Sequence, residues 1–100
     1  HISYPVLIAS HIKPYKDCDK KEQFDVNNGL LLSKNLDSLF DGGYITFDDQ
    51  GKIIIADELD PKIHEQYKGL SIPDEIFNSD RKKYMKYHRE VEFRKFIFKN

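Results

Sequence analysis

The sequence predicts an α+β domain with two β-hairpins, a short helix between them and a C-terminal helix. Apolar runs within residues 4–12 and at 30–32 have the length of buried strands. Apolar residues spaced as on a helix face follow at 36–40. Two more apolar runs, at 44–47 and 52–55, flank a turn with a late glycine, which is typical of a hairpin. A chain of 100 residues holding these elements has room for one domain only.

The first hairpin has an unusually long connection. Its first strand is expected to end at His11, and Asn28-Gly29 leads into the second strand. Residues 13–27 are polar and repeat with neither the helix nor the strand period, so we predict a long exposed loop. Its acids Asp17, Asp19 and Glu22 are expected to face water, and the minor alternative is that one of them completes a site. Loops of this length in small domains usually serve a function.

The helical segments carry their own start and stop signals. Ser33 is a candidate N-cap for the helix that contains Leu36, and Gly42-Gly43 would end it. A short helix is expected from Pro61 to residue 67, and a longer one from residue 80 to about 92.

Composition excludes several classes of protein. No apolar run approaches the roughly 20 residues of a membrane-spanning helix, so we expect no membrane contact and a cytoplasmic location. Cys18 is the only cysteine, which excludes an internal disulfide and a four-cysteine zinc site. The net charge of −1 argues against non-specific coating of nucleic acid, although residues 81–100 carry +6 and the first 80 residues −7.

Four polar residues surround the first hairpin and the helix after it. His11 stands where a strand ends, Asn28 where its partner begins, and Asp37 and Asp41 lie four residues apart on one helix face. Two carboxylates at that spacing suit one hard divalent cation, with Mg²⁺ or Mn²⁺ favoured. A neutral imidazole nearby is suited to take a proton from water.

These residues occur in three ordered motifs: ASHIKP at 9–14, NGLLL at 28–32 and LDSLFD at 36–41. In these motifs the sequence resembles the HNH endonucleases, in particular a subgroup found at the C-terminus of bacterial restriction endonucleases. The resemblance implies a ββα-metal fold and a single nuclease domain over residues 1–100. Its core motif would cover 6–55 and a basic helical extension 57–100, within a longer protein that carries an N-terminal recognition domain.

The resemblance also assigns roles to individual residues. His11 matches the general base, and Asn28 matches the residue that holds the loop and His11 in place. Asp37 and Asp41 match the metal-ligand positions. This chain departs from many members by having Asp37 where they have His, and by having Ser10 where a metal ligand often precedes the base.

Basic residues of the C-terminal part are the first candidates for phosphate contact, because Lys and Arg there would offset the acidic body. Lys13 and Lys16, close to the base, are further candidates. For His88, packing on a helix face and phosphate contact are equally favoured. The C-terminal set is Lys82, Lys83, Lys86, Arg89, Arg94 and Lys95.

We therefore expect a metal-dependent endonuclease acting on double-stranded DNA, as the cleavage domain of a restriction enzyme. A double-strand cut by a domain with one site needs two copies, which suggests a homodimer. The main alternative is a DNA-binding or partner-docking module whose nuclease motif has decayed. A toxin or defence nuclease with less sequence preference is another.

Overall fold

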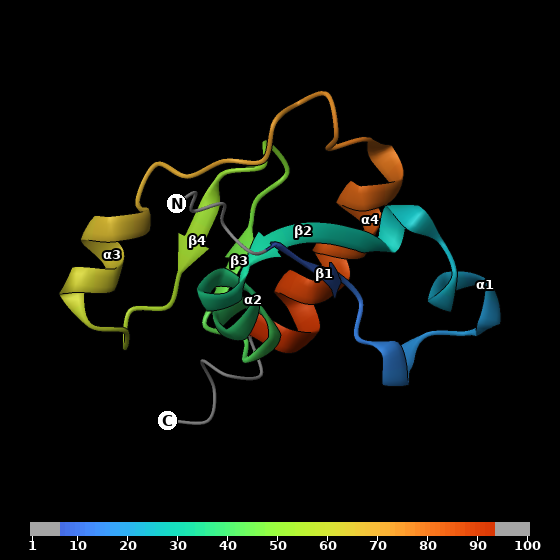
Figure 1. Cartoon of the computed structure of the whole chain (residues 1–100), viewed down its shortest axis with the longest axis horizontal. Helices are drawn as coiled ribbons and strands as arrows, with labels where there is room; N and C mark the ends of the chain where they lie inside the picture. Colours follow the sequence, from blue (N-terminus) through green and yellow to red (C-terminus); the bar gives the residue numbers. More distant parts are fainter. Residues whose placement is uncertain (1–6, 94–100) are drawn as a thin grey trace, which may run out of the picture.

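The computed structural model describes residues 7–93 and contains two separate two-stranded antiparallel sheets. In the first, β1 (Leu7–His11) pairs with β2 (Gly29–Ser33), and His11 lies opposite Gly29. In the second, β3 (Ile45–Phe47) pairs with β4 (Ile53–Ile55). Both predicted hairpins and the α+β class are confirmed (Figure 1).

Helix α2 (Lys34–Asp41) joins the two hairpins and packs against β1, β2 and β3. The Ser33 side chain accepts a hydrogen bond from the Leu36 N–H, so the predicted N-cap is confirmed. Gly43, with φ of 79°, ends the helix in the left-handed region that glycine enters without strain. The start and the end of α2 are thus both fixed by residues at its boundaries.

The connection between β1 and β2 differs from the predicted loop because it contains three short helical turns. They are η1 (Tyr15–Asp17), α1 (Lys20–Gln23) and η2 (Val26–Asn28). Asp19 and Glu22 cap α1 reciprocally, each side chain accepting from the other residue's backbone N–H. These turns are too short to show an apolar repeat, and for that reason the hydrophobic pattern did not reveal them.

Within the described residues, helices α3 and α4 follow the second hairpin. Helix α3 (Pro61–Tyr67) matches the prediction. Helix α4 (Ser79–Tyr87) begins at an Asn78 cap and continues as a π-helical turn, η3 (His88–Phe93), close to the predicted end at residue 92. Among residues 7–93, no helix is long and apolar enough to cross a membrane.

One apolar core joins these elements. It includes Phe40 of α2, Phe47 of β3 and Met85 of α4, each at most 1% exposed. In Figure 1, α2 and α4 lie close to the first hairpin, whereas α1 and α3 lie at opposite ends of the molecule. The first hairpin and α2 are thus held in a fixed relation by a shared core.

Candidate active site

His11 is the last residue of β1, and its ring is half-buried. Its Nε2 lies 3.3 Å from the Gln23 carbonyl oxygen, and its ring meets the Tyr15 ring edge-on with centroids 5.5 Å apart. A carbonyl oxygen only accepts, so Nε2 carries the proton in this contact. The neutral ring then has its free lone pair on Nδ1, and this is the atom that can accept a proton from water.

Asn28 lies at the end of the long segment between β1 and β2, and its side chain bonds back to the start and middle of that segment. The residue is 1% exposed, and its Oδ1 accepts from the Lys13 N–H at 2.7 Å. Its Nδ2 donates to the carbonyls of Lys13 and Glu22 and to Sγ of Cys18, at 3.2–3.3 Å. These contacts fix the backbone immediately after His11. The bonds across the loop that the resemblance implied are therefore present, and the effect of Asn28 on catalysis stays a prediction.

Asp37 and Asp41 project from α2 toward the end of β1. Asp37 lies in the first helical turn, where a negative charge interacts favourably with the helix dipole, and Asp41 lies at the last residue. Both line a surface hollow of about 400 Å³, and His11 lines the same hollow. Its remaining lining residues are Ile8, Ala9, Ser10, Pro14, Tyr15 and Lys16. The structure thus brings the predicted base and both predicted ligands to one hollow.

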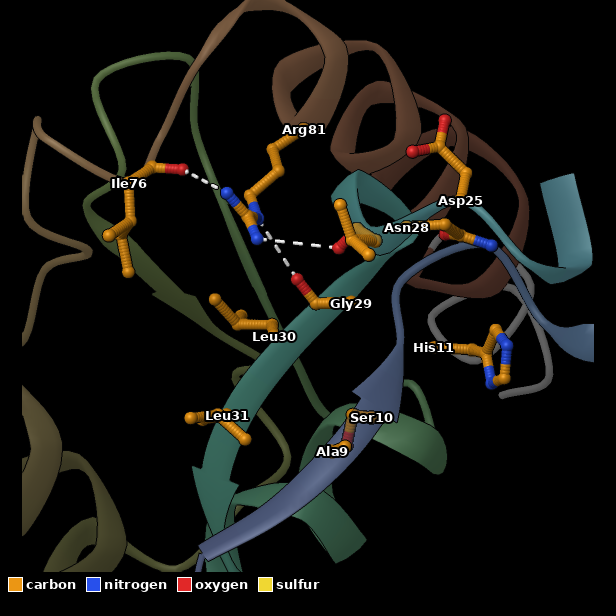
Figure 2. A pocket seen from close by; sticks show the side chains of 11 residues that line it. Ala9, Ser10, His11, Asp25, Asn28, Gly29, Leu30, Leu31, Ile76 and Arg81 are labelled. Atoms are coloured by element: carbon orange, nitrogen blue, oxygen red, sulfur yellow. Dashed lines mark hydrogen bonds between the residues drawn. The ribbon is translucent and has the colours of Figure 1, made fainter.

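A larger hollow of about 440 Å³ lies beside β2 and is lined mainly by apolar side chains. Figure 2 shows Leu30 and Leu31 on one side of the hairpin, with the His11 ring directed away from them. The only carboxylate in its lining, Asp25, accepts from the Tyr84 hydroxyl at 2.7 Å and from the Asn27 N–H at 2.9 Å. Because both oxygens of Asp25 are engaged, the hollow at α2 is the better site for metal-dependent chemistry.

The donor set at α2 fits a hard divalent cation. No group of three or more His, Cys, Asp or Glu side chains within residues 7–93 is arranged to hold a metal. However, Mg²⁺ is commonly bound by one or two carboxylates, with water and substrate phosphate completing its shell. Asp37 and Asp41 on one hollow provide such a pair.

Lys13 is already engaged by neighbours. Its Nζ lies 3.0 Å from both carboxylate oxygens of Glu22 and 4.8 Å from the centre of the Tyr87 ring. The hydrogen bond to Glu22 raises the pKa of Lys13. This ion pair ties Lys13 into the scaffold of the loop, and its contact with phosphate stays a prediction. Lys16 is exposed and lines the hollow at α2, so it is the better candidate.

Asp17 and Asp19 of the connection are exposed to water as predicted, Glu22 is half-buried, and all three also bond to protein groups. Asp17 accepts from the Tyr87 hydroxyl at 2.9 Å, and this bond raises the pKa of Tyr87 to about 12. Asp19 and Glu22 form the α1 cap, and Glu22 also pairs with Lys13. The acids hold the connection together instead of only facing water.

His88 cannot contact a phosphate, because it is 2% exposed. Its ring stacks on Phe40 at 3.8 Å, its Nε2 donates to the Phe40 carbonyl at 2.9 Å, and its Nδ1 accepts from Thr46 at 2.8 Å. Burial lowers the pKa of His88 to about 4. The packing alternative is the correct one of the two.

The remaining basic candidates divide into two groups. Lys82, Lys83 and Lys86 are exposed on α4 and remain available to a polyanion. Arg89 is tied down, since it donates to the Phe47 carbonyl at 2.7 Å and pairs with Asp49 at 3.0 Å. Those contacts assign Arg89 to packing between η3 and the second hairpin. The predictions for Arg94 and Lys95 fall outside the described residues.

Sequence reasoning gave no functional role to two side chains of the site. Ser10 donates a hydrogen bond to Oδ1 of Asp37, and Tyr15 packs on the His11 ring. Both lie within four residues of His11, and Ser10 also stands where a metal ligand often precedes the base in the family that the sequence resembles.

A β-hairpin and a following helix bring an imidazole and two carboxylates to one hollow, and this small α+β fold is consistent with a domain of the HNH type. The comparison with protein families agrees, because residues 1–48 match the model described as HNH endonuclease. The resemblance to this family is therefore confirmed. The match covers β1, the long connection, β2, α2 and β3. Among curated proteins, no match to the chain was found.

Proposed function

We propose that this domain is a metal-dependent endonuclease that hydrolyses phosphodiester bonds in double-stranded DNA. The observation that carries the proposal is the shared hollow of His11, Asp37 and Asp41. The family match to HNH endonucleases supports nuclease activity and DNA as the substrate.

His11 acts as the general base in this proposal. Its Nδ1 takes a proton from a water molecule while the Gln23 carbonyl holds Nε2–H, so the ring keeps one orientation. Asn28 fixes the backbone that follows, and Tyr15 packs against the ring. When bound, a divalent cation held by Asp37 and Asp41 supplies charge neutralisation at the phosphate and at the leaving 3′ oxygen. Lys16 adds positive charge at the rim of the hollow.

We further propose that the domain is the cleavage part of a cytoplasmic bacterial restriction enzyme that acts as a homodimer, with sequence recognition by another domain. A site of one base and one metal per chain cuts one strand, so two copies are needed for a double-strand break. Bases must be read by residues outside the catalytic motif.

The test is nicking of supercoiled plasmid by the wild-type chain and by His11→Ala in Mg²⁺ or Mn²⁺. We expect His11→Ala to abolish cleavage while its unfolding temperature and Mn²⁺ affinity stay close to wild type. His64→Ala is a matched control, because His64 lies on α3, bonds to the Ala56 carbonyl and does not line the hollow at α2. EDTA should stop wild-type nicking.

Two outcomes would contradict the proposal. Cleavage that survives His11→Ala removes this residue as the base. Absence of metal-dependent nicking in the wild-type chain, combined with retained DNA binding, would favour the decayed module. That alternative is motivated by Ser10, which stands where a metal ligand often precedes the base.

A further inference from the structure

Ser10 is the only buried polar side chain of β1. It is 5% exposed, and it neighbours His11. Its hydroxyl donates to Oδ1 of Asp37, which is 27 positions away in sequence and lies on α2. This bond links the strand that carries the base to the helix that carries the carboxylates.

The bond restricts Asp37 in a specific way. A carboxylate on a half-exposed helix side chain can normally rotate, and either oxygen can face a ligand. Ser10 engages Oδ1, and within residues 7–93 Oδ2 has no hydrogen-bond partner. The Asp37 carboxylate is therefore held in one orientation on the wall of the hollow, with one oxygen engaged and one available.

We propose that Ser10 is a positioning residue for Asp37, holding Oδ1 so that Oδ2 is presented to a divalent cation. This inference rests on the proposed function. In the family that the sequence resembles, the residue before the base is often a metal ligand. In this chain that residue is Ser10, whose hydroxyl would orient Asp37, a metal ligand on α2. Partners of metal ligands commonly affect metal affinity about 10–100-fold when they are removed, because they fix the ligand's direction.

The test is direct Mn²⁺ binding to the folded chain, measured by the electron paramagnetic resonance signal of free Mn²⁺. We expect Ser10→Ala to weaken the affinity about tenfold. Ser10→Ala should still fold, because it removes the hydroxyl and leaves Asp37 accessible to water, and thermal unfolding checks this. Ser10→Thr keeps the donor and should restore most of the affinity.

Two comparisons separate positioning from a general loss of structure. Ser38→Ala makes the same change on α2, one residue from Asp37 and at an exposed position, and should leave Mn²⁺ affinity unchanged. In an Asp37→Asn background, Ser10→Ala should add no further loss, because the two residues act through one bond.

The outcomes distinguish this inference from the proposed function. The role of Ser10 is overturned if Ser10→Ala binds Mn²⁺ as tightly as the wild type. It is also overturned if Ser10→Ala weakens Mn²⁺ binding as much in the Asp37→Asn background as in the wild type. In either case, nicking that depends on His11 still supports the proposed nuclease function. A wild-type chain that neither binds Mn²⁺ nor nicks DNA overturns both.

Discussion

At the scale of single residues, two of the four histidines of the chain lie in opposite environments. His11 lies half-buried at a surface hollow, whereas His88 is enclosed between Phe40 and Thr46. In the neutral His88 ring, one nitrogen donates to a carbonyl and the other accepts from a hydroxyl, so both are satisfied. A second proton would place a charge in the core, and the cost of burying that charge lowers the pKa of His88.

His88 should therefore make the domain sensitive to acid. Its pKa is about 4 in the folded state and about 6.5 when unfolded, so only the unfolded state binds a proton between these values. Folding stability should fall as the pH drops from 6.5 toward 4, by about 3 kcal/mol in total. Urea unfolding at a series of pH values measures this loss.

The matched variants for this prediction are His88→Gln and His64→Gln. Glutamine does not titrate but can donate to the Phe40 carbonyl and accept from Thr46, so His88→Gln should flatten the stability curve between pH 6.5 and 4.5. His64→Gln should keep the wild-type slope. An unchanged slope in His88→Gln would assign the acid sensitivity to other groups.

At the scale of secondary-structure elements, Arg81 links α4 to the start of β2. Its guanidinium donates to the carbonyls of Gly29, Ile76 and Val26 at 2.8–3.3 Å. Figure 2 shows Arg81 between Ile76 and Gly29, with dashed lines for these bonds. The planar guanidinium reaches three carbonyls at once, two of them on the turn over residues 26–29, and a lysine ammonium does not have this shape. The turn that Arg81 holds contains Asn28, so the α4 contact supports the residue behind His11.

Arg81→Lys should accordingly destabilise the fold by about 2 kcal/mol, because it keeps the charge but leaves carbonyls without partners. The exposed neighbour Lys82 provides the control, since Lys82→Met should change stability by less than about 0.5 kcal/mol. Urea denaturation of both variants tests this. Equal stabilities for the two would show that the three carbonyls are satisfied by water when Arg81 is replaced.

Elements with strong local signals were predictable from the sequence, and those built by tertiary contacts were not. The hairpins and α2 follow from apolar spacing, the Ser33 cap and the glycines at 42 and 43. The turns within residues 13–28 depend on side-chain bonds such as Asp19 with Glu22, and they carry no apolar period. Likewise, spacing placed Asp37 and Asp41 on one face, but only the fold shows that Ser10 reaches Asp37. His88 was ambiguous because a helix pattern does not reveal which side is buried.

At the scale of the whole molecule, charge is distributed unevenly over an almost neutral chain. The net charge is −1, and the site itself is acidic through Asp37 and Asp41. A polyanion can approach such a site only if basic residues elsewhere on the surface compensate. Lys82, Lys83 and Lys86 are exposed on α4 and, unlike Lys13 and Arg89, form no ion pair within the described residues.

Replacing Lys82, Lys83 and Lys86 together by Gln should therefore weaken DNA binding. Each phosphate contact that is lost lowers the slope of log K against log salt by about 0.9, so the slope should fall by up to about 3. Fluorescence anisotropy with a short duplex in EDTA, at several salt concentrations, measures this without cleavage. Lys52 immediately precedes β4, Lys62 lies on α3 and Lys68 follows α3. Replacing these three by Gln gives the same change in net charge at a different place. If both triple variants lose DNA affinity equally, net charge alone governs binding. If only the α4 variant loses affinity, DNA lies along α4.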